Sequence, residues 1–497
     1  MSNIRVTYSG LISLLISLVS VITGTIFIII VTRRLSPEDF GTWGLIGGLI
    51  TYVLVVEPII SFWLTRQTAR GMNLGKISLI SSGFFSAGGM IVYIVIAIFV
   101  GQQSDANLSA LILATILIPF MFVTKTLTAI GLGSKPQTAS YGNLVFELIK
   151  IPAGLFFVYF LDLGVEGAIV TTVFAYAGNI IVLGIFVRDK IRDKIKIKVL
   201  KNWIRMSWIP LYSSIPNLVF SLDVMIFSVL TGTVLGVAYF SASLAVTSLV
   251  SHSGAITRGL YPKLLSGGKR EHLQTNLRLF FYFAFPLVAM TLSFSKPALF
   301  VLNPIYLIAV PVVVFLTIRG FFYQFNALLY QSLQGIEEVD IDEKSTFRIY
   351  LKSKLAWLPT LRLIEFSLYV SSLAAILLID NKSEQIELVI RWSAVILIVQ
   401  IPFSIYLYSL VKKNFPLKIG AVNLMKYLVT SIITFGSAFY LMDKFLIYNE
   451  SVFVFIANLL PFVIFGAGAY LGITFLIDSK TRGLFKSIIN ELGTKMS

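Results

Sequence analysis

The chain is a succession of apolar runs, each about as long as a bilayer is thick. Roughly 20 apolar residues cross the hydrocarbon layer as a helix, and every backbone polar group in lipid must be satisfied within its own span. The runs recur along the whole of the 497 residues. They predict an all-α integral membrane protein with fourteen spans, near residues 8–31, 40–64, 77–100, 108–132, 142–161, 163–187, 207–231, 233–256, 279–302, 305–330, 357–379, 388–411, 420–442 and 452–477.

Composition supports this fold class and narrows the chemistry. Only 13% of the residues are charged, against about a quarter in soluble domains. There is no cysteine, and His252 and His272 are the only histidines. We therefore expect no disulfide, no metal and no catalytic centre. The first run is too long for a signal-peptide core and lacks a small-residue cleavage site, so we expect it to be retained as a span.

The basic residues set the expected orientation. Of the 40 Lys and Arg, thirty fall on one side of the predicted spans and five on the other. Positive charge gathers on the cytoplasmic side of membrane proteins. We therefore expect a multi-pass protein of the cell membrane with both termini in the cytoplasm. The net charge of +16 is explained by this orientation and does not indicate a nucleic-acid partner.

The largest cytoplasmic connection divides the chain into two blocks. Between Val187 and Trp208, Ile191, Ile195, Val199 and Trp203 recur every four residues with lysines between them. This pattern predicts either an amphipathic helix on the inner leaflet or a basic linker that follows the charge rule. The expected domains are a lobe over 1–187, this linker over 188–206, a second lobe over 207–411, and two additional spans with a tail over 412–497.

A short internal echo fits the division into two blocks. "FGTWGL" (Phe40–Leu45) follows the first predicted span, and "VAYFSA" (Val237–Ala242) follows the seventh. Both enter a new helix just past a predicted outer turn. Internal repeats of this kind are common in transporters, which place substrate sites between the repeats.

The first outer turn resembles that of a known family. "VTRRLSPEDFGTWGLIGGLITYV" (Val31–Val53) is similar to the first outer turn and second span of the polysaccharide flippases, in the multidrug/oligosaccharidyl-lipid/polysaccharide transporter superfamily; Leu35, Ser36, Pro37, Glu38, Phe40 and Gly41 carry the pattern. "GVAYFSAS" (Gly236–Ser243) resembles the matching turn of the second block. The resemblance implies two six-helix lobes around a central cavity, two additional helices, and alternating access.

Seven of the ionisable side chains inside the predicted spans are the candidate site residues. They are the cations Lys150, Arg319 and Arg362, and the carboxyl groups of Glu57, Glu147, Asp223 and Glu365. Charges at membrane depth are costly and usually face a wet cavity or a partner. A spacing of three places Glu147 with Lys150, and Arg362 with Glu365, on one helix face. The simpler interpretation is that such pairs only hold helices together.

The chemistry of these residues suits a phosphate-bearing lipid. Cations lining a cavity would offset the desolvation of a phosphate or pyrophosphate, and Arg suits bidentate contact with phosphate oxygens. The carboxylates could bind H⁺ or Na⁺ as coupling ions; no other cofactor is expected. From the resemblance, the substrate and partner would be a polyprenyl-linked oligosaccharide within the membrane lipids, with glycan-assembly enzymes as further candidate partners.

Two other functions are alternatives to this one. A cation-coupled multidrug exporter of the same superfamily is the main alternative, although twelve spans would be usual there. A membrane glycosyltransferase or glycan polymerase would need catalytic acids on sizeable outer loops. The longest outer stretch, Asp380–Glu387, is too small for that. The expected function is therefore a lipid-linked oligosaccharide flippase for cell-surface glycan assembly, not an enzyme.

Overall fold

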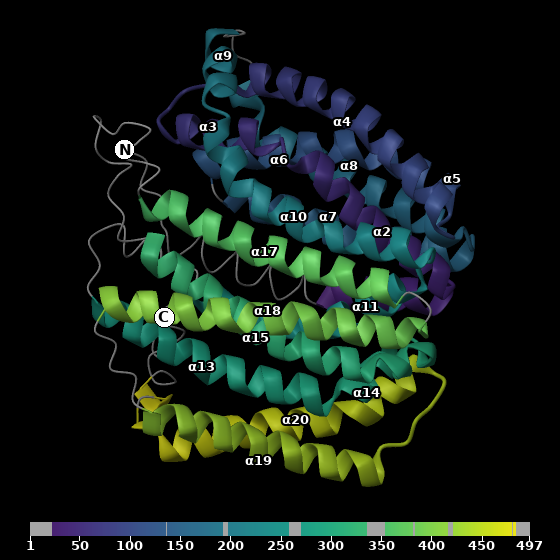
Figure 1. Cartoon of the computed structure of the whole chain (residues 1–497), viewed down its shortest axis with the longest axis vertical. Coiled ribbons are helices and arrows are strands. Elements are labelled where there is room, and N and C mark those ends of the chain that lie inside the picture. The colour runs from purple at the N-terminus through teal and green to yellow at the C-terminus, as the bar shows by residue number, and fades with distance from the viewer. Residues whose placement is uncertain are drawn as a thin grey trace, which may run out of the picture. The chain divides into compact units, whose positions relative to one another are not determined.

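The protein is all-helical over the residues that the structure describes. This computed structural model describes residues 22–135, 137–191, 197–257, 270–334, 353–380, 383–415, 421–479 and 481–483, and every regular element in them is a helix (Figure 1). Two compact units result. One comprises Met1–Ser241 with Pro359–Val389, and the other Ala242–Leu358 with Ile390–Ser497. The lobe boundaries expected from the chain order stay a prediction.

The helices follow one another with short connections. Residues 22–34 are helical. The elements after them are α2 (Pro37–Leu54), α3 (Pro58–Ala69), α4 (Gly75–Gln103), α5 (Leu108–Leu113), η1 (Ala114–Ile116), α6 (Leu117–Ser134), α7 (Gln137–Gly154), η2 (Leu155–Phe160), α8 (Gly164–Ile191), α9 (Ile197–Arg205), α10 (Trp208–Thr231), α11 (Leu235–Ser251), η3 (His252–Thr257), α13 (Arg270–Ser293), α14 (Ser295–Leu302), η4 (Pro304–Ala309), α15 (Val310–Gln334), α17 (Lys354–Ile379), α18 (Gln385–Asn414), α19 (Ala421–Phe445) and α20 (Val452–Ile477).

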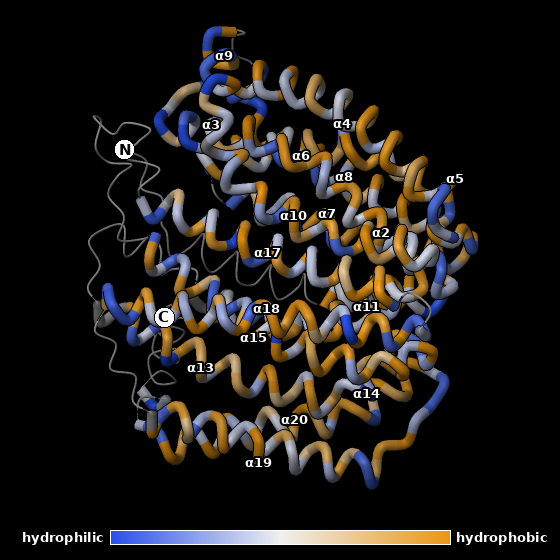
Figure 2. The backbone as a smooth tube through the Cα atoms, in the orientation of Figure 1, coloured by the Kyte–Doolittle hydropathy of each residue, from blue (hydrophilic) through white to orange (hydrophobic). Residues whose placement is uncertain are grey.

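The expected spans are recovered as long apolar helices. Among the described residues, 12 helices are long and apolar enough to cross a membrane, and the count is 13 if the bent pair α2 and α3 is taken as one span. The expected first span, 8–31, lies outside the described residues up to 21 and is helical beyond them. The chain is therefore a multi-pass membrane protein, as its hydropathy predicts, and Figure 2 shows the helices mostly in apolar colours.

The outer-turn motif is a helix start. The Ser36 hydroxyl accepts a hydrogen bond from the Asp39 backbone N–H (3.1 Å), and Pro37 occupies the first turn of α2. Ser at the N-cap, Pro at the first position and acidic residues in the first turn all stabilise a helix N-terminus. The residues that carry the family resemblance thus have a direct structural role.

The span expected over 40–64 is broken in the middle. α2 ends at Leu54, α3 begins at Pro58, and the two axes meet at 64°. Proline lacks a backbone N–H and its ring collides with the preceding turn, so Pro58 accounts for the break. Glu57 is the residue immediately before it and lies at the corner. A proline in this position is expected to kink a helix, and here the helix is fully interrupted.

A second irregularity lies in the stretch with the paired charges. Pro152 is inside α7, and three residues later the helix widens into the π-helical segment η2, Leu155–Phe160. A proline removes one hydrogen bond of the helical ladder, and π-segments are a usual way of absorbing such a defect. Glu147 and Lys150 therefore lie on regular helix just before the irregular part.

The basic connection forms a helix, but not one that only rests on lipid. Of its expected apolar row, Ile191 ends α8 and Ile195 lies outside the described residues. Trp203 of α9 is 1% exposed and donates from Nε1 to Gln67 Oε1 (3.1 Å). Val199 packs in the same cluster of buried side chains. One face of α9 is therefore fixed to the protein, and the expected position of this helix on the inner leaflet stays a prediction.

The two echoing motifs pack against each other. A Cβ added to Gly41 would lie 2.2 Å from the backbone oxygen of Val234, and one added to Gly44 would lie 2.5 Å from Ser241 Oγ. Asp105 holds the same turn, since its Oδ1 accepts from the Val234 N–H (2.7 Å). The glycines of the first motif are thus needed because the start of α11 comes very close to α2.

The two additional helices pack within the second unit. α19 contacts both α13 and α20, and Tyr282, Tyr427 and Tyr470 form a buried aromatic cluster between them. Tyr470 donates to the Tyr282 carbonyl oxygen (2.6 Å), and Tyr427 donates to Asp478 Oδ2 (2.6 Å). These helices are therefore an integral part of that unit.

Candidate functional site

The seven candidate residues are distributed over several helices. Glu57, Glu147, Lys150, Asp223, Arg362 and Glu365 belong to the first unit, and Arg319 belongs to the second. Each unit is described separately below. Within the first unit the candidates form three groups with different partners.

Glu147 and Lys150 both turn to the helix over 22–34. The Thr23 hydroxyl donates to Glu147 Oε2 (3.1 Å). The Lys150 Nζ lies 4.5 Å from the centre of the Phe27 ring and 5.5 Å from that of Phe146. The ion pairs within 4.0 Å that the described residues show do not include one between Glu147 and Lys150. The i,i+3 salt bridge suggested by their spacing is thus replaced by contacts to another span.

The ammonium group of Lys150 lies on aromatic rings and interacts with the Glu147 carboxylate only at a distance. An ammonium over an aromatic face gains about 0.5–2 kcal/mol, depending on how far it is desolvated. The ring faces do not cancel the positive charge as a carboxylate would. Lys150, which is half-buried, therefore remains able to attract an anion.

Glu57 is a deeply buried carboxyl group of the first unit. It is 3% exposed and lies at the corner between α2 and α3. Its Oε2 accepts from the Ser61 hydroxyl (3.1 Å) and is 4.0 Å from Lys125 Nζ. Its Oε1 is buried and has no hydrogen-bond partner among the described residues. A buried carboxyl oxygen without a donor is a place where a proton or a small cation would be accommodated.

Asp223 of α10 accepts a hydrogen bond from a tyrosine hydroxyl of α17. It is 2% exposed, and the Tyr369 hydroxyl donates to its Oδ2 (2.7 Å). Its Oδ1 accepts from the Val224 backbone N–H (2.8 Å). Phe220, one turn earlier, packs against the Tyr369 ring at 5.7 Å between centroids. Asp223 is thus a buried carboxyl group whose surroundings are fixed by packing.

Arg362 and Glu365 lie on α17, the helix whose Tyr369 donates a hydrogen bond to Asp223 of α10. Glu365 is 6% exposed, and Tyr369 follows it by one turn of α17. Arg362 is half-buried. α17 therefore brings a cation, a carboxyl group and the tyrosine that binds Asp223 into about two turns. Their spacing on one face is as expected from the sequence.

Arg319 has a partner on its own helix. Its guanidinium carbon lies 4.9 Å from the centre of the Tyr323 ring, one turn further along α15. The residue that Arg319 contacts on its own helix is therefore an aromatic one. The planar guanidinium stacks well on an aromatic face.

Several residues of these groups were not found from the sequence. Thr23, Phe27, Lys125 and Tyr369 make the contacts just described. Lys125 lies within α6. The one available signal was the i,i+4 spacing of Thr23 and Phe27, which places them on one helix face. That signal does not indicate which span the face meets.

These groups offer binding and coupling chemistry. Over the described residues, there is no cluster of three or more His, Cys, Asp or Glu side chains that could hold a metal ion. Each group instead combines a buried carboxyl or a half-buried cation with hydroxyl or aromatic partners. Such groups bind protons, monovalent cations and anions at membrane depth.

Known proteins resemble the chain in structure. No protein-family model and no curated sequence matches it. A multidrug resistance MATE family transporter of the MOP superfamily, solved in an inward-facing conformation, aligns with a TM-score of 0.59 and 16% identity, over 81% of this chain and 98% of that one. A second transporter of this kind, solved in an outward-facing conformation, aligns with a TM-score of 0.52 and 16% identity, over 82% of this chain and 95% of that one.

A third structure has the same fold, and its title reports a different polarity of the binding pocket. It is a MOP superfamily transporter from Pyrococcus furiosus whose title states that a binding pocket of reverse polarity suggests a different function. The TM-score is 0.53 and the identity 14%, over 82% of this chain and 95% of that one. All three neighbours are transporters, not enzymes. The chain therefore has the fold of the MATE transporters of the MOP superfamily.

Proposed function

We propose that the chain is a flippase that moves a polyprenyl-phosphate- or pyrophosphate-linked oligosaccharide from the inner to the outer leaflet of the cell membrane. It works by alternating access, for cell-surface glycan assembly. The transporter fold supports transport in general. The additional helices α19 and α20, and the cations at membrane depth, support an anionic lipid-linked substrate over a drug.

The observation that carries the proposal is the setting of Lys150. Its ammonium group lies on Phe27 and Phe146, and Glu147 bonds to Thr23 instead of to the lysine. A positive charge placed inside a span is costly. Glu147 is near enough to interact electrostatically with Lys150, but the ion pairs within 4.0 Å among the described residues do not join the two, so the ammonium group can still bind an arriving anion. A phosphate or pyrophosphate is such an anion. We assign the same role to Arg319 and Arg362.

The carboxyl groups supply the coupling in this proposal. Glu57, Glu147, Asp223 and Glu365 would take up H⁺ or Na⁺ and release it during the transport cycle. The unpartnered Oε1 of Glu57 supports this role most directly. Glycan-assembly enzymes remain candidate partners that would deliver the substrate.

The test is flipping in reconstituted vesicles. A labelled polyprenyl-pyrophosphate-linked oligosaccharide is placed in one leaflet, and its arrival in the other is measured by an impermeant lectin or glycosidase. We expect Lys150→Gln to lose most of the activity and Lys150→Arg to keep part of it. The matched control is Arg188→Gln, which removes a charge at a side chain 69% exposed in the same unit. Normal flipping by Lys150→Gln would contradict the proposal.

The second candidate is a cation-coupled multidrug exporter. The titles of the inward- and outward-facing neighbours name multidrug resistance transporters, and buried carboxyl groups such as Asp223 suit organic cations. Efflux of a cationic dye separates the two functions. A drug exporter would need Asp223 and would tolerate Lys150→Gln, because removing a positive charge from the path of a cation does not hinder it.

A further inference from the structure

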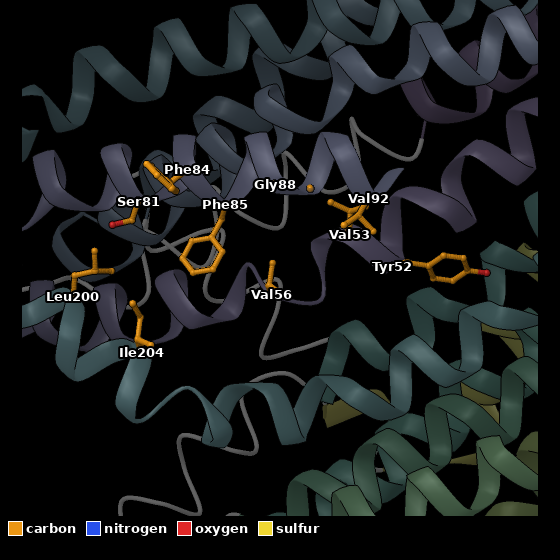
Figure 3. Close-up of a pocket in the computed structure, with 11 residues that line it drawn as sticks. Tyr52, Val53, Val56, Ser81, Phe84, Phe85, Gly88, Val92, Leu200 and Ile204 are labelled. Carbon is orange, nitrogen blue, oxygen red and sulfur yellow. The ribbon is translucent and has the colours of Figure 1, made fainter. Parts of the chain in front are cut away.

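A cavity of about 450 Å³ lies within the first unit, between the inner part of α4, the end of α2 and the helix α9. Its walls are Tyr52, Val53, Val56, Ser81, Phe84, Phe85, Gly88, Gly89, Val92, Leu200 and Ile204. In Figure 3, Leu200 and Ile204 border it on one side and Tyr52 on the other. Its size falls within the range of small-molecule sites, about 300–1,000 Å³.

The cavity offers no free polar group to an occupant. Its two side-chain hydroxyls are already used: Ser81 donates to the Ile77 carbonyl oxygen (2.8 Å), and Tyr52 donates to that of Ser221 (2.7 Å). The remaining walls are aliphatic, aromatic or glycine. A sugar or a polar drug would lose hydrogen bonds there, so the chemistry suits a hydrocarbon chain.

The cavity is open towards the lipid. Phe84 at its edge is 84% exposed, and a Cβ on Gly88 would meet nothing within 4 Å. Both residues lie on α4, which is apolar enough to span the membrane. A chain from the surrounding bilayer can therefore enter without crossing a polar barrier.

A basic strip runs beside the apolar one on α9. Leu200 and Ile204 line the cavity, and Lys201 and Arg205, each the next residue along, are exposed. Residues four apart lie above one another on a helix, so the two cations form a row next to the apolar row. Trp203 fixes the rotation of α9 by packing into the protein. The cations are thus held beside the mouth of the cavity.

We infer that this cavity binds one hydrocarbon chain of an anionic phospholipid whose phosphate is held by Lys201 and Arg205. The apolar walls accept the chain and the basic strip accepts the headgroup. The lipid belongs to the leaflet at α9, which the distribution of basic residues predicts to be the cytoplasmic one. This site is separate from the transported substrate and does not depend on the proposed function.

Binding to the full-length purified chain tests the tail site. Native mass spectrometry measures the dissociation constant of the first bound lipid, with dioleoyl phosphatidylglycerol as the probe. Gly88→Trp fills the cavity, and Gly83→Trp is the matched control. Both glycines are exposed on α4 and have open space around a Cβ, but Gly83 does not line the cavity.

We expect Gly88→Trp to weaken binding by about tenfold or more, since two displaced methylene groups already correspond to about that factor. Gly83→Trp should bind as the wild type does. Equal binding by all three proteins would overturn the tail site, because the lipid would then be an ordinary member of the annulus.

Dioleoyl phosphatidylcholine, which has the same chains and no net charge, tests the headgroup site. We expect the wild type to prefer phosphatidylglycerol by about fivefold for each basic side chain, from roughly 1 kcal/mol per cation. Lys201→Gln/Arg205→Gln should remove that preference. The control Lys412→Gln/Lys413→Gln lowers the charge equally, at two exposed residues in the last turn of α18, and should keep it.

Two results would overturn the assignment of the occupant. Equal affinity of the wild type for both phospholipids would show that the site does not select an anionic headgroup. The second result is that an equimolar polyprenyl phosphate displaces phosphatidylglycerol from the wild type but binds Gly88→Trp poorly. The occupant of the cavity would then be a polyprenyl chain. Flipping activity is measured separately, so its loss or retention does not bear on either result.

Discussion

In the ion pair of Glu57 and Lys125, we expect the loss of one partner to destabilise the protein more than the loss of the other. Lys125 has 47% of its side chain exposed and Glu57 only 3%. Losing the carboxylate therefore leaves a lysine that can reach water. Losing the lysine leaves a charge buried at the corner between α2 and α3. We expect Lys125→Met to destabilise the protein and Glu57→Gln to change its stability little or even raise it.

The size of the effect follows from the distance. At 4.0 Å, two unit charges attract by about 4 kcal/mol at an effective dielectric constant of 20 and by about 1 kcal/mol in bulk water. Because one partner is half-exposed, we expect about 2 kcal/mol for Lys125→Met. The double variant Glu57→Gln/Lys125→Met removes both charges. It should recover most of the loss, which corresponds to a coupling energy of the same size.

The assay is the thermal unfolding midpoint of the wild type, the two single variants and the double variant. The midpoint is obtained in detergent from the fraction of protein that stays monodisperse after heating. Lys125→Arg is the control, since it keeps the charge and should unfold near the wild-type midpoint. Equal destabilisation by Glu57→Gln and Lys125→Met would refute the reasoning. So would a double variant that is as unstable as the two single changes added together.

Three further predictions concern packing, a buried hydrogen bond and orientation. Gly41→Ala should destabilise the protein by about 1–3 kcal/mol from overpacking, because the added Cβ would lie 2.2 Å from a backbone oxygen. Gly47→Ala on the same helix has open space around the Cβ and should stabilise the protein by about 0.5–1 kcal/mol. Thermal unfolding compares the two variants. Tyr369→Phe should cost about 1.5–3 kcal/mol by removing the hydroxyl that binds Asp223, and Asp223→Asn should cost less in that background than alone. Ser104→Cys, in a chain without cysteine, should react with an impermeant thiol reagent from outside; reaction only from inside would reverse the topology.

The sequence predicts the helices well because span length and apolar runs are local properties. The interruption at Glu57 and the helix start at Ser36 follow from proline and capping chemistry within a few residues. Contacts between spans are a different matter. The spacing of Glu147 and Lys150 suggests a salt bridge, yet the partner residues Thr23 and Phe27 lie more than a hundred positions earlier. Periodicity shows that two residues share a face, and it does not show what that face meets.

The same limit applies to Lys125 and to Tyr369. A basic residue near the end of an apolar run looks like a loop charge, because hydropathy averages over the window and does not register a buried carboxylate two helices away. Tyrosine at membrane depth looks like ordinary packing until its hydroxyl is placed against Asp223. The site assignment therefore needs the three-dimensional arrangement, even where every candidate residue is visible in the sequence.

The order of the pair Glu57 and Lys125 along the chain has a consequence for biogenesis. Synthesis proceeds at about 5–20 residues per second, so the 68 positions between them correspond to roughly 3–14 s. During that interval the carboxyl group has left the ribosome and its counter-charge has not. The bent pair of α2 and α3 is therefore synthesised with Glu57 lacking this partner until α6 arrives. Glu147 does not face this delay, because the span that carries Thr23 is made first.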